Sequence, residues 1–380
     1  MSRKVVIVGP AYPLRGGGMA TFNERLAYAF QEAGDEVEIV TFSLQYPSFL
    51  FPGKSQYSDE PAPKGLSIKV LINSINPISW WRAGRYIASQ RPELVVFRYW
   101  LPFMGPALGT IARIIRKNKY SRILAITDNV VPHETRPGDV PFTKYFLKAC
   151  HGFITMSRSV QQDLEKYEPR KPSLYLPHPL YDNFGAAEPK EEACKALSLE
   201  PKYNYILFFG FIRAYKGLDI LLKAMADDRF KALSGLKLIV AGEFYEDAAP
   251  YHQLIQELNL QDRLVLRTDF IPNPEVRHYF CAADLVVQPY KHATQSGVTQ
   301  VAYHFDKPMV VTRVGGLSEL VPDGEVGYVV EPEPDAIASA IIQFYTSENA
   351  PGFTQNINRY KKRFSWQRFV EATWELADKV

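Results

Sequence analysis

The chain has 380 residues, of which 46% are hydrophobic and 22% charged, and its formal net charge at pH 7 is +3. This length exceeds one compact core and fits two domains of ordinary size. A nucleic-acid partner would favour a higher pI and a concentrated basic face, and neither stands out in this sequence. The cysteines Cys150, Cys194 and Cys281 lie far apart without metal-ligand spacing, so we expect a reduced, cytoplasmic compartment and no metal site.

Two apolar segments could be taken for targeting or membrane signals. The run at residues 5–8 follows two cations, but it is too short for a signal peptide and ends in Gly9-Pro10. An uncharged candidate for a membrane span, residues 99–112, falls short of about 20 residues and contains two prolines. We therefore expect neither a signal peptide nor a membrane-spanning helix.

Short β-branched runs alternate with amphipathic helical patterns through the first half of the chain. Such alternation predicts parallel strands joined by crossover helices, and hence an α/β domain. The pattern pauses at Pro177-His178-Pro179 and at a charged stretch, residues 188–192, which we interpret as the linker. The predicted strands of this half are 5–8, 37–41, 94–97, 123–127, 153–156 and 173–176.

The same alternation restarts after the linker and predicts a second doubly wound domain, so that two such domains face one cleft. A last amphipathic pattern, residues 366–376, is expected to pack back toward the first domain. The predicted domains are residues 1–178 and 179–363, followed by a returning segment at 364–380. The predicted strands of the second half are 205–209, 236–241, 264–267, 285–288, 309–312 and 327–330.

Ligands of open α/β sheets bind beyond the carboxyl ends of the strands, so the loops that follow the strands carry the candidate site. After the first strand come three successive glycines, Gly16, Gly17 and Gly18, ahead of a helical pattern. Glycines let backbone amides approach a ligand with no Cβ in the way. A dinucleotide fingerprint does not follow this strand, and a plain flexible loop is the alternative interpretation.

The most informative motif lies between an apolar strand and a helical pattern that starts at Leu218. Here Arg213 and Lys216 stand on a strand-to-helix turn that we expect to be exposed, where helix amides point outward and favour an anion. The planar fork of an arginine and the point charge of a lysine together suit the two phosphates of a nucleotide diphosphate. The alternative is a helix start whose cations are only solvated.

A second anion-ready helix start follows the strand at 285–288. The polar run ends in Ser296-Gly297-Val298, directly before a helix-like stretch. The chain thus has three turns that are rich in glycine or carry cations, one in the first domain and two in the second. Core packing does not readily explain all three, so together they indicate a ligand site.

These motifs resemble glycosyltransferase family 4, whose members are retaining enzymes of GT-B fold. The resemblance rests on the glycine loop after the first strand, on the Arg-x-x-Lys-Gly turn at 213–217, and on Gly315-Gly316 after the strand that begins near Lys307-Pro308. It implies a nucleotide diphosphate sugar as donor, with the diphosphate on the two cations and the nucleoside along the second domain. The expected donor-binding residues are Gly16, Gly17, Gly18, Arg213, Lys216, Gly242, Ile271, Thr294, Gln295, Ser296, Gly297 and Val298.

The chain departs from the family pattern in two places. Many members carry a Glu-x7-Glu pair in the segment after the strand at 285–288, but residues 291–305 contain no acid, so Gln300 and its neighbours can offer only neutral hydrogen bonds. The family often places a histidine after the strand at 123–127, where this chain has Asp128, with His133 five residues on. We expect Asp128 or His133 near the reacting carbon. The alternative is that Asp128 caps a turn and His133 lies on the surface.

Acceptors bind the first domain in this architecture, and that domain has aromatic residues beside cations. Trp80, Trp81 and Arg82 form one such group, and a basic stretch follows at 113–119. This combination is typical of a peripheral docking surface on anionic lipid. The alternative, packing between helix and sheet, is favoured for Trp100 and Phe103.

The residues indicate a diphosphate site, and the resemblance implies a retaining hexosyltransferase that acts on a glycan or lipid-linked acceptor, in cell-surface polysaccharide or glycolipid assembly. The chain contains no Asp-x-Asp, so we expect no metal and no further cofactor. A GT-B sugar-nucleotide epimerase remains an alternative, because it needs the same diphosphate site. A two-lobed ligand-binding protein is a second alternative from a different class.

Overall fold

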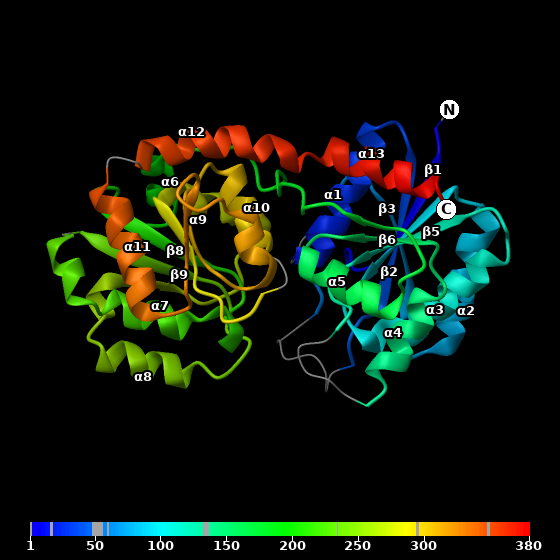
Figure 1. The fold of residues 1–380 in the computed structure, drawn as a ribbon, viewed down its shortest axis with the longest axis horizontal. Coiled ribbons are helices and arrows are strands. Elements are labelled where there is room, and N and C mark those ends of the chain that lie inside the picture. Colours follow the sequence, from blue (N-terminus) through cyan, green and yellow to red (C-terminus); the bar gives the residue numbers. More distant parts are fainter. Residues whose placement is uncertain are drawn as a thin grey trace. The chain divides into compact units, whose positions relative to one another are not determined.

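The structure is a computed structural model, and it describes residues 2–15, 18–47, 56–58, 61–131, 137–233, 235–293, 296–347 and 350–380. The chain divides into two compact units, each built on one parallel sheet with helices on both faces (Figure 1). The N-terminal unit comprises Met1–Pro179 and Phe364–Val380, and the C-terminal unit comprises Leu180–Arg363. This α/β architecture, with two Rossmann-like units, is the predicted fold class.

The sheet of the N-terminal unit has seven parallel strands in the order β3-β2-β1-β4-β5-β6-β7. Six of them were predicted, with ends that differ by up to three residues. The seventh, β3, was missed because it is an edge strand whose residues are mostly exposed, so it lacks a continuous apolar run. The strands are β1 (Lys4–Val8), β2 (Glu36–Leu44), β3 (Ser67–Asn73), β4 (Leu94–Tyr99), β5 (Arg122–Thr127), β6 (Gly152–Thr155) and β7 (Ser173–Tyr175).

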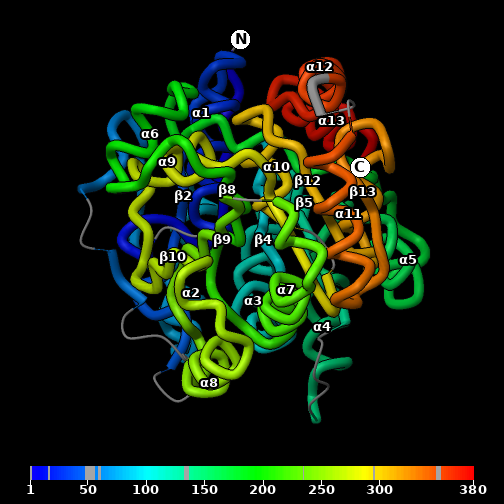
Figure 2. Tube along the Cα trace, turned by 90° about the vertical axis from the view of Figure 1, so that its left-hand side faces the viewer, coloured from blue at the N-terminus to red at the C-terminus, as the bar shows by residue number. Residues whose placement is uncertain are grey.

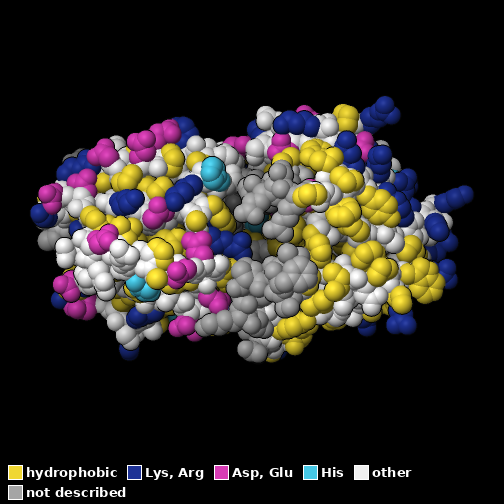
Figure 3. All heavy atoms as spheres, turned by 90° about the horizontal axis from the view of Figure 1, so that it is seen from below, with side chains coloured by type: hydrophobic (Ala, Val, Ile, Leu, Met, Phe, Trp, Pro, Cys, Tyr) yellow, Lys and Arg dark blue, Asp and Glu magenta, His cyan; other side chains and the backbone are white. Residues whose placement is uncertain are grey.

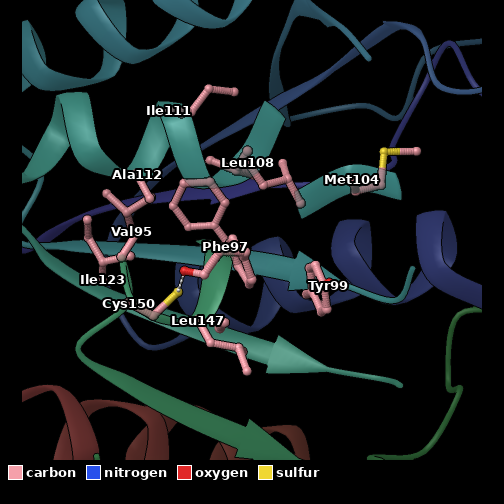
Figure 4. Packing of buried hydrophobic residues seen from close by; sticks show 14 of the residues in the cluster. Val95, Phe97, Tyr99, Met104, Leu108, Ile111, Ala112, Ile123, Leu147 and Cys150 are labelled. Carbon is pink, nitrogen blue, oxygen red and sulfur yellow. Dashed lines mark hydrogen bonds between the residues drawn. The ribbon is translucent and has the colours of Figure 1, made fainter. Parts of the chain in front are cut away.

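Helices α2, α3 and α4 pack side by side on one face of this sheet. Because successive strand residues point to opposite faces, alternate residues Phe97 and Tyr99 of β4 both enter this layer (Figure 4). There the Tyr99 ring stacks on that of Phe146 at 4.5 Å between centroids. The helices of the unit are α1 (Gly18–Glu32), α2 (Pro77–Gln90), α3 (Gly105–Arg116), α4 (Asp139–Leu147), α5 (Arg158–Tyr167) and α13 (Trp366–Ala377).

The C-terminal helix α13 packs on α1 within the N-terminal unit, so the end of the chain belongs to the same unit as its beginning. The Trp366 ring lies 5.1 Å from that of Phe22, and the indole of Trp374 donates a hydrogen bond of 2.8 Å to Asp35. Both tryptophans are buried, which explains the amphipathic pattern of this segment.

The sheet of the C-terminal unit has six parallel strands in the order β10-β9-β8-β11-β12-β13, and all six were predicted to within one residue. Helices α7 and α11 lie side by side on one face (Figures 1 and 2), and α6 packs with α9. The strands are β8 (Asn204–Phe209), β9 (Leu236–Ala241), β10 (Leu264–Arg267), β11 (Leu285–Gln288), β12 (Met309–Thr312) and β13 (Gly327–Val330), and the helices are α6 (Lys190–Ala196), α7 (Leu218–Met225), α8 (Ala249–Glu257), α9 (Val276–Ala282), α10 (Gly297–His304), α11 (Pro334–Thr346) and α12 (Ala350–Tyr360).

Each sheet reverses its winding direction once. In the C-terminal unit the chain runs from β8 outward to β10 and then returns to β11 on the other side of β8, and in the N-terminal unit the reversal falls between β1 and β4. Ligands of open α/β sheets bind at the carboxyl ends of the strands that flank such a switch point. Within the described part of the chain, no helix is both long enough and apolar enough to cross a bilayer.

Candidate functional site

The two loops at the switch point of the C-terminal unit, residues 210–217 after β8 and the described residues 289–293 after β11, are in direct contact. The backbone amide of Lys291 donates to the Tyr215 carbonyl at 2.7 Å, and its ammonium pairs with Asp219 of α7 at 2.9 Å. Gly217 has φ 69°, and a Cβ built there would lie 1.9 Å from the Pro289 carbonyl oxygen. Only glycine therefore allows the two loops to meet this closely.

Lys216 is the buried cation of this switch point. Its side chain is 9% exposed, and its ammonium lies 5.8 Å from the centre of the Tyr290 ring and faces the α-carbon of Gly210. Among the described residues no carboxylate pairs with it. Burial, with a smaller contribution from the Arg213 charge, lowers the pKa of Lys216 to about 7. The expectation that both cations sit on an exposed turn was therefore wrong for Lys216, although an uncompensated cation beneath the loop suits an anion.

Arg213 is exposed, and it lies on the outer side of the same turn. Its guanidinium is 5.1 Å from the ring centre of Tyr245, which stacks on Phe211 at 4.2 Å. The amide of Ala214 donates to the carboxylate of Glu246 at 2.8 Å, which fastens this turn to the loop after β9. The arginine thus stands on a turn that is held from both sides.

Gly242 closes the carboxyl end of β9 against the loop after β8. It has φ 142°, and a Cβ there would lie 2.3 Å from the carbonyl oxygen of Gly210. A side chain at this position would push the two strand ends apart, so glycine is required for the close approach. Gly242 therefore holds the end of β9 close to Gly210, which the Lys216 ammonium faces, and its role in donor binding stays a prediction.

The loop after β11 leads into α10. The Ser296 side chain makes no cap hydrogen bond to the helix, and its hydroxyl lies 3.4 Å from that of buried Tyr290. Burial raises the pKa of Tyr290, so this phenol stays neutral. Val298 approaches Gly210 from the first turn of α10, which begins at Gly297. The structure thus brings the start of α10 to the Lys216 turn, while Thr294 and Gln295 lie outside the described residues.

Two buried glutamines beside this loop differ in their hydrogen bonding. The amide of Gln288 is matched with the Thr299 hydroxyl at 3.1 and 3.2 Å. The amide nitrogen and oxygen of Gln300, on α10, have no hydrogen-bond partner among the described residues, although the side chain is fully buried. An unmatched buried amide is rare and needs an explanation.

The remaining donor-binding candidates belong to other segments of the chain. Ile271 is half-buried on the loop after β10, the edge strand two places from β8. Gly18 is the exposed first residue of α1 in the N-terminal unit, and Gly16 and Gly17 fall outside the described residues.

Asp128 directly follows β5 in the N-terminal unit, and its carboxylate is bound by Arg98 of β4. The guanidinium donates through Nε and Nη2 to the two carboxylate oxygens, each at 2.6 Å, and both side chains are buried. The backbone amide of Asp128 also donates to the Tyr99 carbonyl at 2.8 Å. Asp128 thus stands at the carboxyl edge as expected, with a partner that was not predicted. His133 lies outside the described residues.

Sequence reasoning missed three residues that shape these sites. Arg98 was overlooked although a cation within an apolar run such as Leu94–Tyr99 is itself a signal, because a buried strand tolerates a charge only when it is paired. The pairing of Asp219 with Lys291 and the anchoring role of Glu246 depend on tertiary contacts that have no local pattern. Within the described ranges, no group of His, Cys, Asp or Glu could hold a metal ion.

A comparison with protein families matches residues 203–347, which lie wholly within the C-terminal unit, to the model described as glycosyl transferases group 1. An uncharacterized glycosyltransferase of Methanocaldococcus jannaschii is 30% identical over 174 residues, covering 45% of this chain and 47% of that protein. The D-inositol 3-phosphate glycosyltransferase of Corynebacterium urealyticum is 27% identical over 199 residues, covering 50% and 47%. The chain thus spans about half the length of these curated relatives.

Solved structures match the fold over nearly the whole chain. Sucrose-phosphate synthase from Thermosynechococcus elongatus superposes with a TM-score of 0.75 at 17% identity and covers 99% of both chains. Anabaena HepE in complex with UDP-glucose superposes with a TM-score of 0.71 at 16% identity, covering 99% of this chain and 98% of that one. The fold is therefore GT-B, with a glycosyl transferases group 1 domain in the C-terminal unit.

Proposed function

We propose that the protein is a retaining hexosyltransferase of glycosyltransferase family 4, which transfers a sugar from a nucleotide diphosphate sugar to a hydroxyl acceptor. The observation that carries this proposal is Lys216, a buried ammonium with no carboxylate partner among the described residues, set at the switch point between the Arg213 turn and the start of α10. The relatives named as glycosyltransferases support the reaction class, and a fold neighbour solved with UDP-glucose supports the donor class.

The geometry suggests how the leaving group is stabilised. As the bond between the anomeric carbon and the diphosphate oxygen breaks, negative charge grows on the diphosphate. Arg213, Lys216 and the amides at the start of α10 then bind it more strongly than in the ground state. The departing phosphate can take the proton of the acceptor hydroxyl as the new bond forms. Side chains near the reacting carbon, Asp128 or His133, would then mainly position the reactants.

We further propose that the acceptor is a glycan or a lipid-linked glycan, reached through peripheral contact with an anionic membrane. Of the ten large hydrophobic side chains that are exposed among the described residues, nine belong to the N-terminal unit. Figure 3 shows hydrophobic side chains gathered on the visible face of this unit, bordered by Lys and Arg. Trp81 is 56% exposed beside Ile78 on α2, and the Arg85 guanidinium lies 5.7 Å from its ring. Such a surface fits cell-surface polysaccharide or glycolipid assembly.

Titration calorimetry with uridine, guanosine and adenosine diphosphate sugars tests the donor site. One of these donors should bind wild-type protein, and at 100 times its Kd it should add about 2.7 kcal/mol of stability. Lys216→Ala and Arg213→Ala should each lose on the order of 3 kcal/mol of transition-state stabilisation, about two decades in kcat/KM. The matched control is Lys223→Ala, which removes an exposed cation from α7, the helix that follows the turn.

Product analysis separates the alternatives. Conversion of the sugar nucleotide without an acceptor would instead indicate an epimerase, and tight binding without turnover would indicate a binding protein. Because the cations stand where a metal would act on the diphosphate, we expect full activity in excess EDTA. Loss of activity in EDTA that magnesium or manganese restores would contradict the metal-independent mechanism.

A further inference from the structure

A buried ion pair at the switch point of the N-terminal unit joins the ends of two neighbouring strands. Arg98 is 3% exposed within β4, and Asp128 follows β5. The guanidinium spans the carboxylate, with both hydrogen bonds at 2.6 Å. A fork that binds both oxygens fixes the plane of the carboxylate as well as its position, which a lysine ammonium cannot do.

Neighbouring groups confine the arginine itself. Its guanidinium lies 4.1 Å above the ring of Phe22 on α1. At the end of β1, a Cβ on Gly9 would lie 2.9 Å from the Arg98 Cβ and 2.6 Å from the Asn23 amide nitrogen, so this packing leaves no room for a side chain. The Asn23 amide in turn donates to the Pro10 carbonyl at 2.9 Å. The orientation of Arg98, and with it that of Asp128, is therefore set by three elements.

Stability alone does not explain this cluster of buried polar groups. Replacing a buried ion pair by apolar residues of similar volume is often neutral or stabilising, because two charges are taken out of water. Two further polar atoms of the cluster, Arg98 Nη1 and Asn23 Oδ1, are buried without a hydrogen-bond partner among the described residues. These unmatched atoms further lower the stability of the fold. They lie near the carboxyl ends of β1, β4 and β5, the edge where ligands of such sheets bind. Costly polar groups gathered at a ligand-binding edge indicate a functional constraint.

We infer that Arg98 is a positioning residue, which holds the Asp128 carboxylate in one orientation so that it accepts a hydrogen bond from a sugar hydroxyl in the transition state. This inference rests on the proposed function, because Asp128 is one of the two residues, with His133, that are expected near the reacting carbon. Arg98 acts through Asp128 and not on the donor diphosphate. Asp128 then works as a fixed acceptor of a hydrogen bond and not as a mobile base.

The test measures kcat, KM and donor affinity separately in four variants. Arg98→Lys keeps the charge but loses the fork, and Asp128→Asn keeps the shape but loses the charge. Each should lower kcat on the order of 100-fold, the scale of a misplaced group, while donor affinity in the C-terminal unit stays within twofold. Lys171→Met removes a partly buried cation before β7, at the opposite edge of the same sheet, and should keep wild-type kcat.

A double variant separates positioning from folding. Arg98→Met with Asp128→Leu replaces the ion pair by apolar groups and should fold at least as stably as Arg98→Lys, yet stay inactive. Wild-type kcat in this double variant would show that the pair is only structural and overturn the inference. Wild-type kcat in Arg98→Lys, together with a slow Asp128→Asn, would also overturn it while leaving Asp128 at the reaction centre. Failure of wild-type protein to bind any donor contradicts the proposed function instead, so the two failures are distinguishable.

Discussion

Lys216 combines a cation with a nearly dry environment, and at the proposed donor site this combination would couple proton binding to ligand binding. In the free protein, burial and the neighbouring Arg213 lower the pKa of Lys216 to about 7, so the amine is largely neutral at pH 8. A bound diphosphate favours the charged form. The sign of the linkage follows: binding takes up a proton above pH 7 and takes up almost none below pH 6.

We therefore expect the affinity for a nucleotide diphosphate sugar to be nearly constant below pH 6.5 and to fall as the pH rises, by roughly 20-fold between pH 7 and pH 8.5. Calorimetry at pH 8 in buffers of different ionisation enthalpy should show an uptake close to one proton. Lys216→Arg, which stays charged throughout this range, should bind with little pH dependence. A wild-type affinity that is flat up to pH 8.5 would contradict the buried, shifted amine.

The lowered pKa of Lys216 also makes the free energy of unfolding depend on pH, with the opposite sign from that of a lysine in a stabilising ion pair. Between about pH 7 and the ordinary value of 10.5, the unfolded chain binds this proton more tightly than the folded one. Lys216 therefore costs stability as the pH falls through that window. A residue that destabilises the free protein at neutral pH is understandable where its partner is a ligand.

At the scale of elements, the contact between the loops after β8 and β11 depends on one glycine. Gly217 has a positive φ, and its α-carbon faces the backbone of Pro289. Gly324 also has a positive φ, of 74°, but a Cβ there would meet nothing within 4 Å. The two positions share the backbone strain that a side chain brings and differ only in the clash.

Gly324→Ala should therefore lose about 1 kcal/mol in the free energy of unfolding, the cost of the left-handed conformation. Gly217→Ala should lose clearly more and should also weaken donor binding, because the loop after β11 must move away from the Lys216 turn. Urea denaturation and calorimetry of both variants measure this difference. Equal losses in the two variants, with unchanged donor affinity in Gly217→Ala, would show that the loop contact does not shape the site.

The strands were predictable because both faces of a parallel sheet are buried, which forces continuous β-branched runs such as Leu236–Ala241. The exposed edge strand β3 lacks that constraint and escaped prediction. The loops after β8 and β11 were also predictable, since glycine and cation patterns mark them. The burial of Lys216 and the bidentate hydrogen bonding of Arg98 to Asp128 could not be predicted. Each depends on which strands are neighbours in the sheet, and local sequence patterns do not determine the strand order.

The two units of the molecule differ in how similar their sequences are to known families. The family match lies within the C-terminal unit, whereas the N-terminal unit is matched through its fold. A diphosphate has the same shape in every donor, so its site leaves a local pattern of glycines and cations. An acceptor site must suit one particular hydroxyl compound, and its residues carry no general signature. The acceptor side therefore has to be tested by its surface chemistry.

The exposed hydrophobic and basic residues of α2 lead to the last prediction, which concerns association with vesicles. At low salt the protein should sediment with anionic vesicles, and binding should weaken as salt rises, because each basic residue near the surface contributes about 1 kcal/mol that is screened over roughly 8 Å.

Arg82→Glu with Arg85→Glu should weaken this binding roughly 30-fold or more, since two attractive charges become repulsive. Trp81→Ser should weaken it at every salt concentration, because the exposed indole no longer enters the interface. Lys202→Glu with Lys231→Glu makes the same change in net charge on exposed sites of the C-terminal unit and is the matched control.

Equal effects of the two charge-reversing pairs would indicate a response to net charge alone. Equal recovery of wild-type protein in the supernatant with and without vesicles would favour a soluble acceptor.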